Sequence, residues 1–246
     1  MNAFVQQKTE QQHRKSVPLF YPPPAESFDT PWQITVYSAT HERERWQRYN
    51  EIANRSYATR GLQAVGEERS VDIDQYPTYF AEATIDGAAP IGGVRLHLPN
   101  CCGEIPLLEE LIGYIDIEIL SSLLAPLQSE GITQGSSLWI DPARRYPGLA
   151  GDLARACCAI FVATEARWYV GCAHQYVLDA WHSVGWRAVP SLPTFPYPDS
   201  RYRSFIQLGS QDIWPNEFRL WAEKQVENTR LDGPGARLIV QPMRQK

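Results

Sequence analysis

A stretch that begins at Arg144, Arg-Arg-Tyr-Pro-Gly-Leu-Ala-Gly, combines positive charge and small residues at the start of a predicted helix. The first N–H groups of a helix have no partners within it, and the helix dipole is positive at that end. A helix start is therefore a natural site for an anion such as phosphate. Gly148, Ala150 and Gly151 would let a ligand approach the backbone, and Arg144 and Arg145 would add charge-assisted hydrogen bonds. The alternative is an ordinary strand-to-helix loop that happens to contain these residues.

Asp72 and Asp74 lie two residues apart, just before a predicted hairpin. In extended backbone such residues face the same way, so the two carboxylates would share a face. A pair of this kind can hold a substrate ammonium group or act as a general base. The alternative is a solvated pair of loop residues.

Arg95 lies in the otherwise apolar strand segment IGGVRLHL, where an unpaired charge would be costly. We expect it to bind a carboxylate, which is either Asp72, Asp74 or Glu82 of the chain or a carboxylate of the substrate. A structural ion pair and a substrate-binding role both fit this sequence.

Histidines and cysteines supply the remaining candidates. His174 ends a predicted strand, where it could act as a general base beside an acyl carbonyl, and a histidine that only packs is the alternative. His97 is a weaker candidate for the same role. Cys157 and Cys158 lie inside the apolar helix and are expected to be small core residues. Cys172 is close to a histidine in sequence, but we do not expect it to be a nucleophile.

The bulk composition excludes several classes of protein. The 246 residues carry a net charge of −5, which indicates neither nucleic acid nor an anionic membrane as a general partner. Five cysteines without a C-x-x-C motif fit neither a disulfide framework nor a zinc site, so we expect reduced thiols and no metal. No apolar run approaches the roughly 20 residues of a membrane span. The first residues lack the apolar segment of a signal peptide, so a cytoplasmic location is expected.

Alternating strand and helix signals predict an α/β fold around one core sheet. We expect a Pro-rich tail over residues 1–30, a main domain over 31–209 and a C-terminal extension over 210–246. The predicted strands cover residues 32–39, 78–85, 91–98, 136–141, 168–175 and 202–208, with Asp86-Gly87 as a turn. The predicted helices cover 41–61, one or two segments within 104–131, then 149–167, 176–184 and part of 216–228.

The spacing Arg145-x-x-Gly148-x-Ala150, between a strand and a helix, resembles the acyl-CoA pyrophosphate loop of the GNAT superfamily of N-acyltransferases. That loop has the pattern Gln/Arg-x-x-Gly-x-Gly/Ala. The resemblance implies a central mixed, mostly antiparallel sheet flanked by helices. It also implies that strands 136–141 and 168–175 splay apart and hold the pantetheine arm of acyl-CoA or of an acyl-phosphopantetheine carrier. Apolar residues there, such as Ile140, would line the acyl-donor site.

The segments RSYATRG and VDIDQYPTYFAEATIDGAAPIGGVRLHLP resemble one branch more closely, the acyl-homoserine lactone synthases and the related long-chain N-acyl amino acid synthases. Those proteins carry Glu-x-Asp-x-aromatic-Asp, a hairpin, and an arginine in the second hairpin strand. Asp72 falls on the Glu, Asp74 on the first Asp, Tyr76 on the aromatic residue and Arg95 on the arginine. The resemblance implies catalytic roles for the aspartates and substrate binding by Tyr76 and Arg95, and we also expect Glu82, as a candidate partner of Arg95, at the substrate site.

This resemblance covers about residues 32–208 and includes three departures from the family pattern. The final Asp of the motif is Pro77 here. The charged Glu-x-x-Arg pair before the loop is replaced by Gln134-Gly135-Ser136-Ser137, and Trp181 stands where general GNAT enzymes place a tyrosine acid. The pattern therefore supports the fold and the acyl-donor site more than it supports lactone formation.

The expected function is transfer of an acyl group from acyl-CoA or acyl carrier protein to the amine of an amino-acid-like small molecule. Direct attack by the amine in a ternary complex is expected, because the sequence displays no convincing nucleophile. An acyl carrier protein is typically acidic and would need a basic docking patch around Arg144 and Arg145. Two alternatives stay open: a module of this fold that binds an acyl donor without turnover, and recruitment of the fold to other chemistry such as decarboxylation.

Overall fold

A computed structural model describes residues 31–62, 71–143, 146–164, 166–227, 231 and 233–243. The strands are β1 (Gln33–Ser38), β2 (Thr78–Thr84), β3 (Gly92–His97), β4 (Ile132–Ile140), β5 (Trp168–His174), β6 (Arg187–Ala188), β7 (Ser204–Ser210) and β8 (Arg237–Val240). The helices are α1 (Arg43–Ala58), α3 (Leu107–Glu110), α4 (Ile117–Gln128), α5 (Leu149–Ala163), α6 (Leu178–His182) and α7 (Asn216–Val226), with a 3₁₀ turn, η1 (Gln211–Ile213).

All eight strands join one sheet in the order β6-β7-β5-β4-β3-β2-β1-β8. Neighbouring strands are antiparallel except β4 and β5, which are parallel and connected through α5. The predicted mixed, mostly antiparallel sheet is therefore confirmed. No helix among the described residues is long and apolar enough to cross a membrane.

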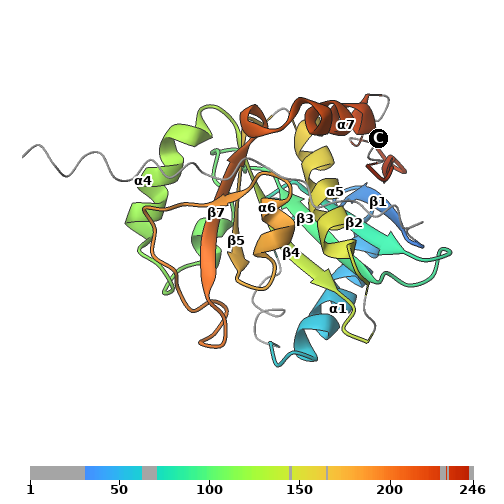
Figure 1. Ribbon diagram of the computed structural model, residues 1–246, viewed down its shortest axis with the longest axis horizontal. Helices are drawn as coiled ribbons and strands as arrows, with labels where there is room; N and C mark the ends of the chain where they lie inside the picture. Colours follow the sequence, from blue (N-terminus) through green and yellow to red (C-terminus); the bar gives the residue numbers. More distant parts are fainter. Residues whose placement is uncertain are drawn as a thin grey trace, which may run out of the picture.

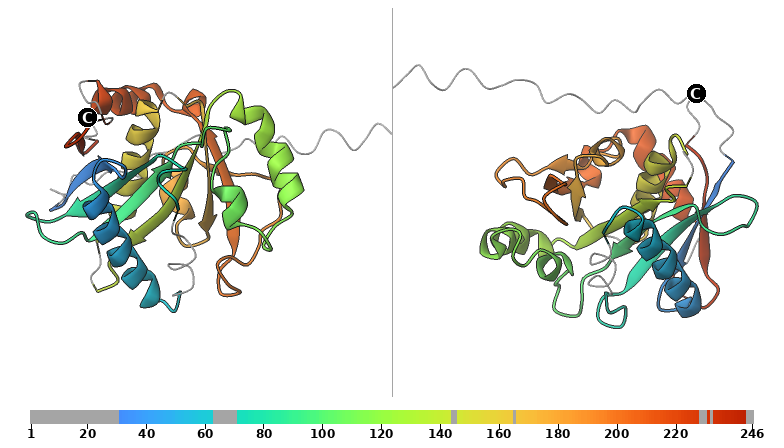
Figure 2. Two further views of the ribbon diagram at one scale, coloured as in Figure 1. Left: turned by 180° about the vertical axis from the view of Figure 1, so that it is seen from behind. Right: turned by 90° about the horizontal axis from the view of Figure 1, so that it is seen from below.

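Helices cover both faces of this sheet (Figure 1). The apolar helix α5 packs over β1 to β4, and α7 packs against α5 on the same face. Turning the molecule brings α1 and α4 to the front, on the opposite face (Figure 2). There, an aromatic cluster joins α1 to β2 and β4 through Trp46, Tyr49, Phe80 and Trp139.

The structure departs from the predicted elements at three strands, one of which is the two-residue strand β6, absent from the predicted set. Strand β4 begins at Ile132, four residues before the predicted start, because polar Gln134 hides the strand pattern although it is fully buried. Strand β8 was not predicted at all, because four residues in a charged segment give a weak signal. The predicted turn at Asp86 and Gly87 is confirmed, and both residues have positive φ, at 49° and 71°.

The two parallel strands separate along their length. β4 and β5 pair only from Ile132↔Trp168 to Gln134↔Val170. Beyond that point β4 continues beside β3, whereas β5 continues beside β7. Within β4 the register shifts by one residue near Ser137, whose φ of 52° is unusual for a residue with a side chain. A bulge of this kind bends the strand and increases its twist, which carries β4 away from β5.

Trp186 lies over the point where the strands separate. A Cβ atom placed on Gly135 would lie 2.5 Å from the Trp186 ring. A Cβ atom on Gly171 would lie 2.8 Å from the same ring and 2.5 Å from the carbonyl oxygen of Gly135. The indole also stacks on Tyr169, with ring centroids 4.4 Å apart. Glycine is therefore required at both strand positions to accommodate this ring.

Gly171→Ala is expected to lower the free energy of unfolding by about 1–3 kcal/mol, because the added methyl group overpacks a closed site. Gly151→Ala provides the matched control: its Cβ would meet only the end of Arg155, at 3.7 Å, and alanine is a better helix former than glycine. Urea denaturation of both variants measures the effect. Equal stability of the two variants would contradict this account of Trp186.

Candidate active site

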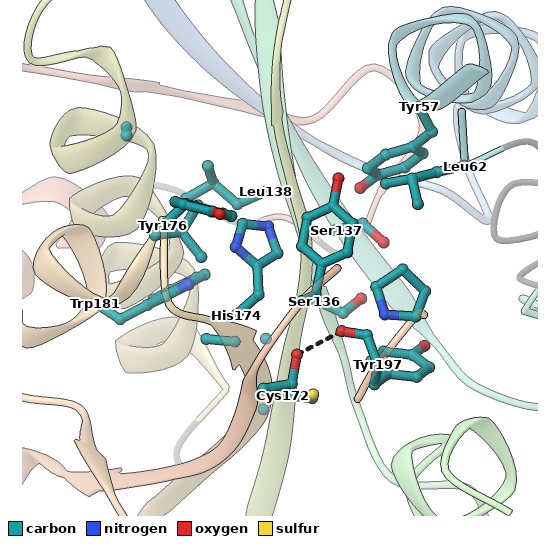
Figure 3. Close-up of a pocket in the computed structure, with 18 of the residues that line it drawn as sticks. Tyr57, Leu62, Ser136, Ser137, Leu138, Cys172, His174, Tyr176, Trp181 and Tyr197 are labelled. Carbon is teal, nitrogen blue, oxygen red and sulfur yellow. Dashed lines mark hydrogen bonds between the residues drawn. The ribbon is translucent and has the colours of Figure 1, made fainter. Parts of the chain in front are cut away.

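A cavity of about 420 Å³ opens between β4 and β5 where the strands separate (Figure 3). Its walls come from the end of α1, both separated strands, the start of α5, the segment around α6, and the segment before β7. The lining residues are Tyr57, Arg60, Leu62, Gly135, Ser136, Ser137, Leu138, Ile140, Ala150, Gly171, Cys172, Ala173, His174, Tyr176, Val177, Trp181, Trp186, Tyr197, Pro198, Tyr202 and Ser204.

The separated strands present backbone edges to this cavity. In the part of the chain that the structure describes, no strand pairs with β4 on its β5 side after Gln134, or with β5 on its β4 side after Val170. Both edges carry N–H and C=O groups that sheet pairing would otherwise satisfy. The cavity can therefore accept an extended ligand that hydrogen-bonds as a strand does.

Ser136 in the cavity wall belongs to a buried polar chain that crosses three strands. Its Oγ accepts a hydrogen bond from Arg95 Nε at 3.1 Å and lies 3.0 Å from His97 Nε2. His97 Nδ1 lies 2.8 Å from Thr78 Oγ1, which donates to the carbonyl oxygen of Tyr76. Sequence reasoning missed Ser136, because the chain depends on strand register: Arg95 lies directly opposite Ser136 across β3 and β4.

His174 lies at the end of β5 and lines the cavity, as Figure 3 shows. Its ring contacts two tyrosines, with centroid distances of 5.8 Å to Tyr176 and 5.1 Å to Tyr202. The structure thus brings this histidine to the same cavity as Ser136. Its role as a general base stays a prediction.

The start of α5 also reaches the cavity. Gly148 precedes the helix with a φ of 86°, a left-handed conformation that favours glycine, and no side chain caps the helix there. Ala150 lines the cavity, as does Ile140 at the end of β4. Gly151 follows in the first turn. Arg144 and Arg145 lie outside the described residues, so the arginine part of the predicted anion site stays a prediction.

Asp72 and Asp74 lie on the surface and do not line the cavity. The expectation that extended backbone gives them a shared face is wrong. The N–H groups of Gln75 and Tyr76 donate to the carbonyl oxygen of Asp72, which folds the segment into a turn. Asp74 pairs with the exposed Arg43, which holds the pKa of that carboxyl below its ordinary value.

Tyr76 and Glu82 are buried but lie outside the cavity lining. Tyr76 donates to Glu109 at 3.1 Å, and burial, supported by that carboxylate, raises the pKa of the phenol to about 12. Glu82 accepts a hydrogen bond from Arg45 at 2.7 Å. Burial raises the pKa of Glu82, and the Arg45 guanidinium opposes that rise. Two of the three carboxylates considered as partners of Arg95, Asp74 and Glu82, therefore bind other arginines.

Trp181, where the sequence resemblance places the tyrosine acid of GNAT enzymes, is buried and lines the cavity. Its ring packs against Trp186, with centroids 4.4 Å apart.

Cys157 and Cys158 are buried, as predicted. Burial raises the pKa of Cys157 to about 12, so its thiol stays protonated at neutral pH. Tyr57 and Arg60, at the end of α1 and just beyond it, also line the cavity; they belong to the segment RSYATRG, but neither was assigned a role from sequence.

Comparison with solved structures shows the fold. The CoA-dependent acyl-homoserine lactone synthase BjaI, solved with SAM and isopentyl-CoA, has a TM-score of 0.51 and 13% identity, with 79% of this chain and 90% of that chain covered. The CoA-dependent acyl-homoserine lactone synthase MesI has a TM-score of 0.51 and 15% identity, with 80% and 100% covered. The chain therefore has the GNAT N-acyltransferase fold, as the sequence resemblance predicted.

Sequence comparison adds relatives without adding an activity. Uncharacterized proteins of Mycobacterium tuberculosis and Mycobacterium bovis are 25% identical over 178 residues, which cover 72% of this chain and 68% of each relative. No family model matches the chain.

Arg45→Met is expected to lower the free energy of unfolding at neutral pH by about 2–4 kcal/mol, because it leaves the Glu82 carboxylate buried without its cation. The Arg45 side chain is 34% exposed, which reduces the effect below that of a fully enclosed pair. A carboxyl whose folded pKa is raised destabilises the protein above its unfolded pKa, so the loss should shrink as the pH falls toward the ordinary glutamate value.

Urea denaturation at a series of pH values measures this effect. Adding Glu82→Gln to the Arg45→Met variant should restore most of the stability, since no buried charge remains. Arg43→Ala, which breaks the exposed pair with Asp74, is the control and should change little. A loss that is independent of pH and not rescued by the glutamine would contradict the assignment.

Proposed function

We propose that this protein transfers an acyl group from a thioester donor, acyl-CoA or acyl carrier protein, to the amine of an amino-acid-like small molecule. One observation carries the proposal: the cavity between β4 and β5 joins two open strand edges to the start of α5. A pantetheine thioester is an extended chain with amide groups, and it ends in phosphate. The cavity offers a partner to each of these parts.

The donor would lie along the separated strands. Its amide groups would hydrogen-bond to the open backbone edges, as a peptide does when it adds to a sheet. Its phosphates would approach the N–H groups at the start of α5, where Gly148 allows close contact. Arg144 and Arg145 would add positive charge at that end.

The reacting thioester would lie beside the β4 bulge. A bulge leaves a residue without its partner across the sheet, and Ser137 and Leu138 both line the cavity. A backbone N–H group of the bulge that points at the thioester carbonyl oxygen would stabilise the negative charge that forms on that oxygen during acyl transfer. His174, on the opposite strand, would remove the proton of the amine.

The acceptor would enter beside Arg60. This exposed arginine lines the cavity, and its Nη2 donates to the carbonyl oxygen of Ile140 at 3.1 Å. An arginine guanidinium has five N–H donors, so it can also bind a carboxylate. Tyr57 lies beside it in the wall. These neighbours suit an acceptor that carries both an amine and a carboxylate.

Ala150→Leu is expected to weaken binding of acyl-CoA about tenfold or more, because the larger side chain fills the cavity at the start of α5. Ala163→Leu, at the exposed end of the same helix, is the matched control and should bind normally. Calorimetric titration and thermal shift with CoA and acyl-CoAs of increasing chain length measure the affinities. Arg145→Ala should also weaken binding if the phosphates lie at this turn.

The pattern of results separates the candidate functions. Binding that depends on chain length, together with turnover in the presence of amino acids, supports the proposed transfer. Binding without turnover with any amine would leave a donor-binding module instead. If no CoA ester binds to the wild-type protein, CoA is not the donor, and an acylated carrier protein becomes the next donor to test.

A further inference from the structure

We propose that Ser136 is a nucleophile that receives the acyl group from the donor as a serine ester before the amine takes it. This inference rests on the proposed function, since the donor is the same thioester. It replaces the direct attack expected from sequence. Ser136 lies in the cavity wall where the strands separate, and 8% of its surface is exposed.

The hydrogen bonds around His97 fix which of its nitrogens can act as a base. Thr78 Oγ1 donates its single proton to the carbonyl oxygen of Tyr76 at 2.8 Å. Both contacts of Thr78 Oγ1 are hydrogen bonds only if it also accepts a proton from His97 Nδ1, which is 2.8 Å away. In the neutral ring Nε2 then has the lone pair, and it faces Ser136 Oγ at 3.0 Å. In this arrangement His97 can accept the proton of Ser136, while Thr78 fixes the orientation of the imidazole ring.

Arg95 completes the activation of the serine. Its Nε donates to Ser136 Oγ at 3.1 Å, so its positive charge stabilises an alkoxide at that oxygen. Arg95, His97 and Thr78 are at most 3% exposed, so little water screens these interactions. The hydroxyl oxygen keeps one further lone pair, which can attack a carbonyl carbon in the cavity.

The step can be written with every proton assigned. Ser136 Oγ bonds to the thioester carbonyl carbon, and its proton moves to His97 Nε2. The carbon–sulfur bond breaks, and the thiolate leaves with the proton from His97 as CoA thiol. In the second half the acceptor amine attacks the serine ester, and His97 takes the amine proton in place of His174 and returns it to Ser136 as the amide leaves.

The cysteines offer the rival nucleophiles. Cys157 and Cys158 are buried in α5. Cys172 lines the same cavity from β5, so it is the position at which an acyl group would overturn the proposal.

The test uses the full-length protein and acyl-CoA without any amine acceptor. Release of CoA thiol is followed with a thiol reagent, and intact mass measures any added acyl group. We expect either one acyl group per protein with a matching burst of CoA or, if water cleaves the ester, continued CoA release. Tandem mass spectrometry of proteolytic peptides should place the acyl group on Ser136.

Three variants and one control define the outcome. Ser136→Ala should bind acyl-CoA but release no CoA, and Ser136→Cys should become acylated as a thioester. His97→Gln, which keeps hydrogen-bonding groups but cannot take a proton, should slow CoA release by about 10² to 10⁴-fold. Ser191→Ala removes an exposed serine outside the cavity and should behave as wild type.

Calorimetric binding of the same acyl-CoA separates this proposal from the proposed function. If wild type binds the donor but releases no CoA without an amine, the serine intermediate is overturned and direct transfer stands. An acyl group found on Cys172 also overturns it. If wild type does not bind the donor at all, the acyl-CoA function fails, and the serine intermediate fails with it.

Discussion

The packing of Trp186 on Gly135 and Gly171 is the constraint on which the candidate site depends. These glycines follow the last paired residues of β4 and β5, so the indole lies where sheet pairing stops. Trp186 in turn packs between Tyr169 and Trp181, with ring centroids 4.4 Å from each. The packing of these three aromatic rings fixes the point at which the strands separate. The cavity and its two open edges begin there.

Strand register then decides which side chains meet at the cavity. Arg95 lies opposite Ser136, and His97 lies opposite Gln134, on the face covered by α1. Buried polar groups are costly unless they are hydrogen-bonded. Here Thr78, His97 and Ser136 form a chain of hydrogen bonds across three strands, and Arg95 donates to Ser136. The opposite face, under α5, is almost entirely apolar. The buried polar chain therefore lies on the face of the sheet opposite α5.

Local patterns predicted much of the fold and less of the site. The apolar helix α5, the hairpin and the strands around it have clear periodicity, and the loop before α5 has a recognisable spacing. Ser136 could not be selected in the same way, because its partners lie about 40 residues earlier in sequence and meet it only through the register of β3 and β4. Asp72 and Asp74 were selected by their spacing and by the family resemblance, yet a turn and a pair between Asp74 and Arg43 keep them at the surface.

The lengths of the outermost strands have a consequence for association between molecules. β6 has two residues and β8 has four, and β8 carries the exposed Arg237. Short, charged outer strands give a neighbouring chain few backbone groups to pair with, so they oppose aggregation through strand addition. The longer unpaired edges of β4 and β5 lie inside a cavity of about 420 Å³. A strand of another protein could pair with these edges only by entering the cavity between β4 and β5.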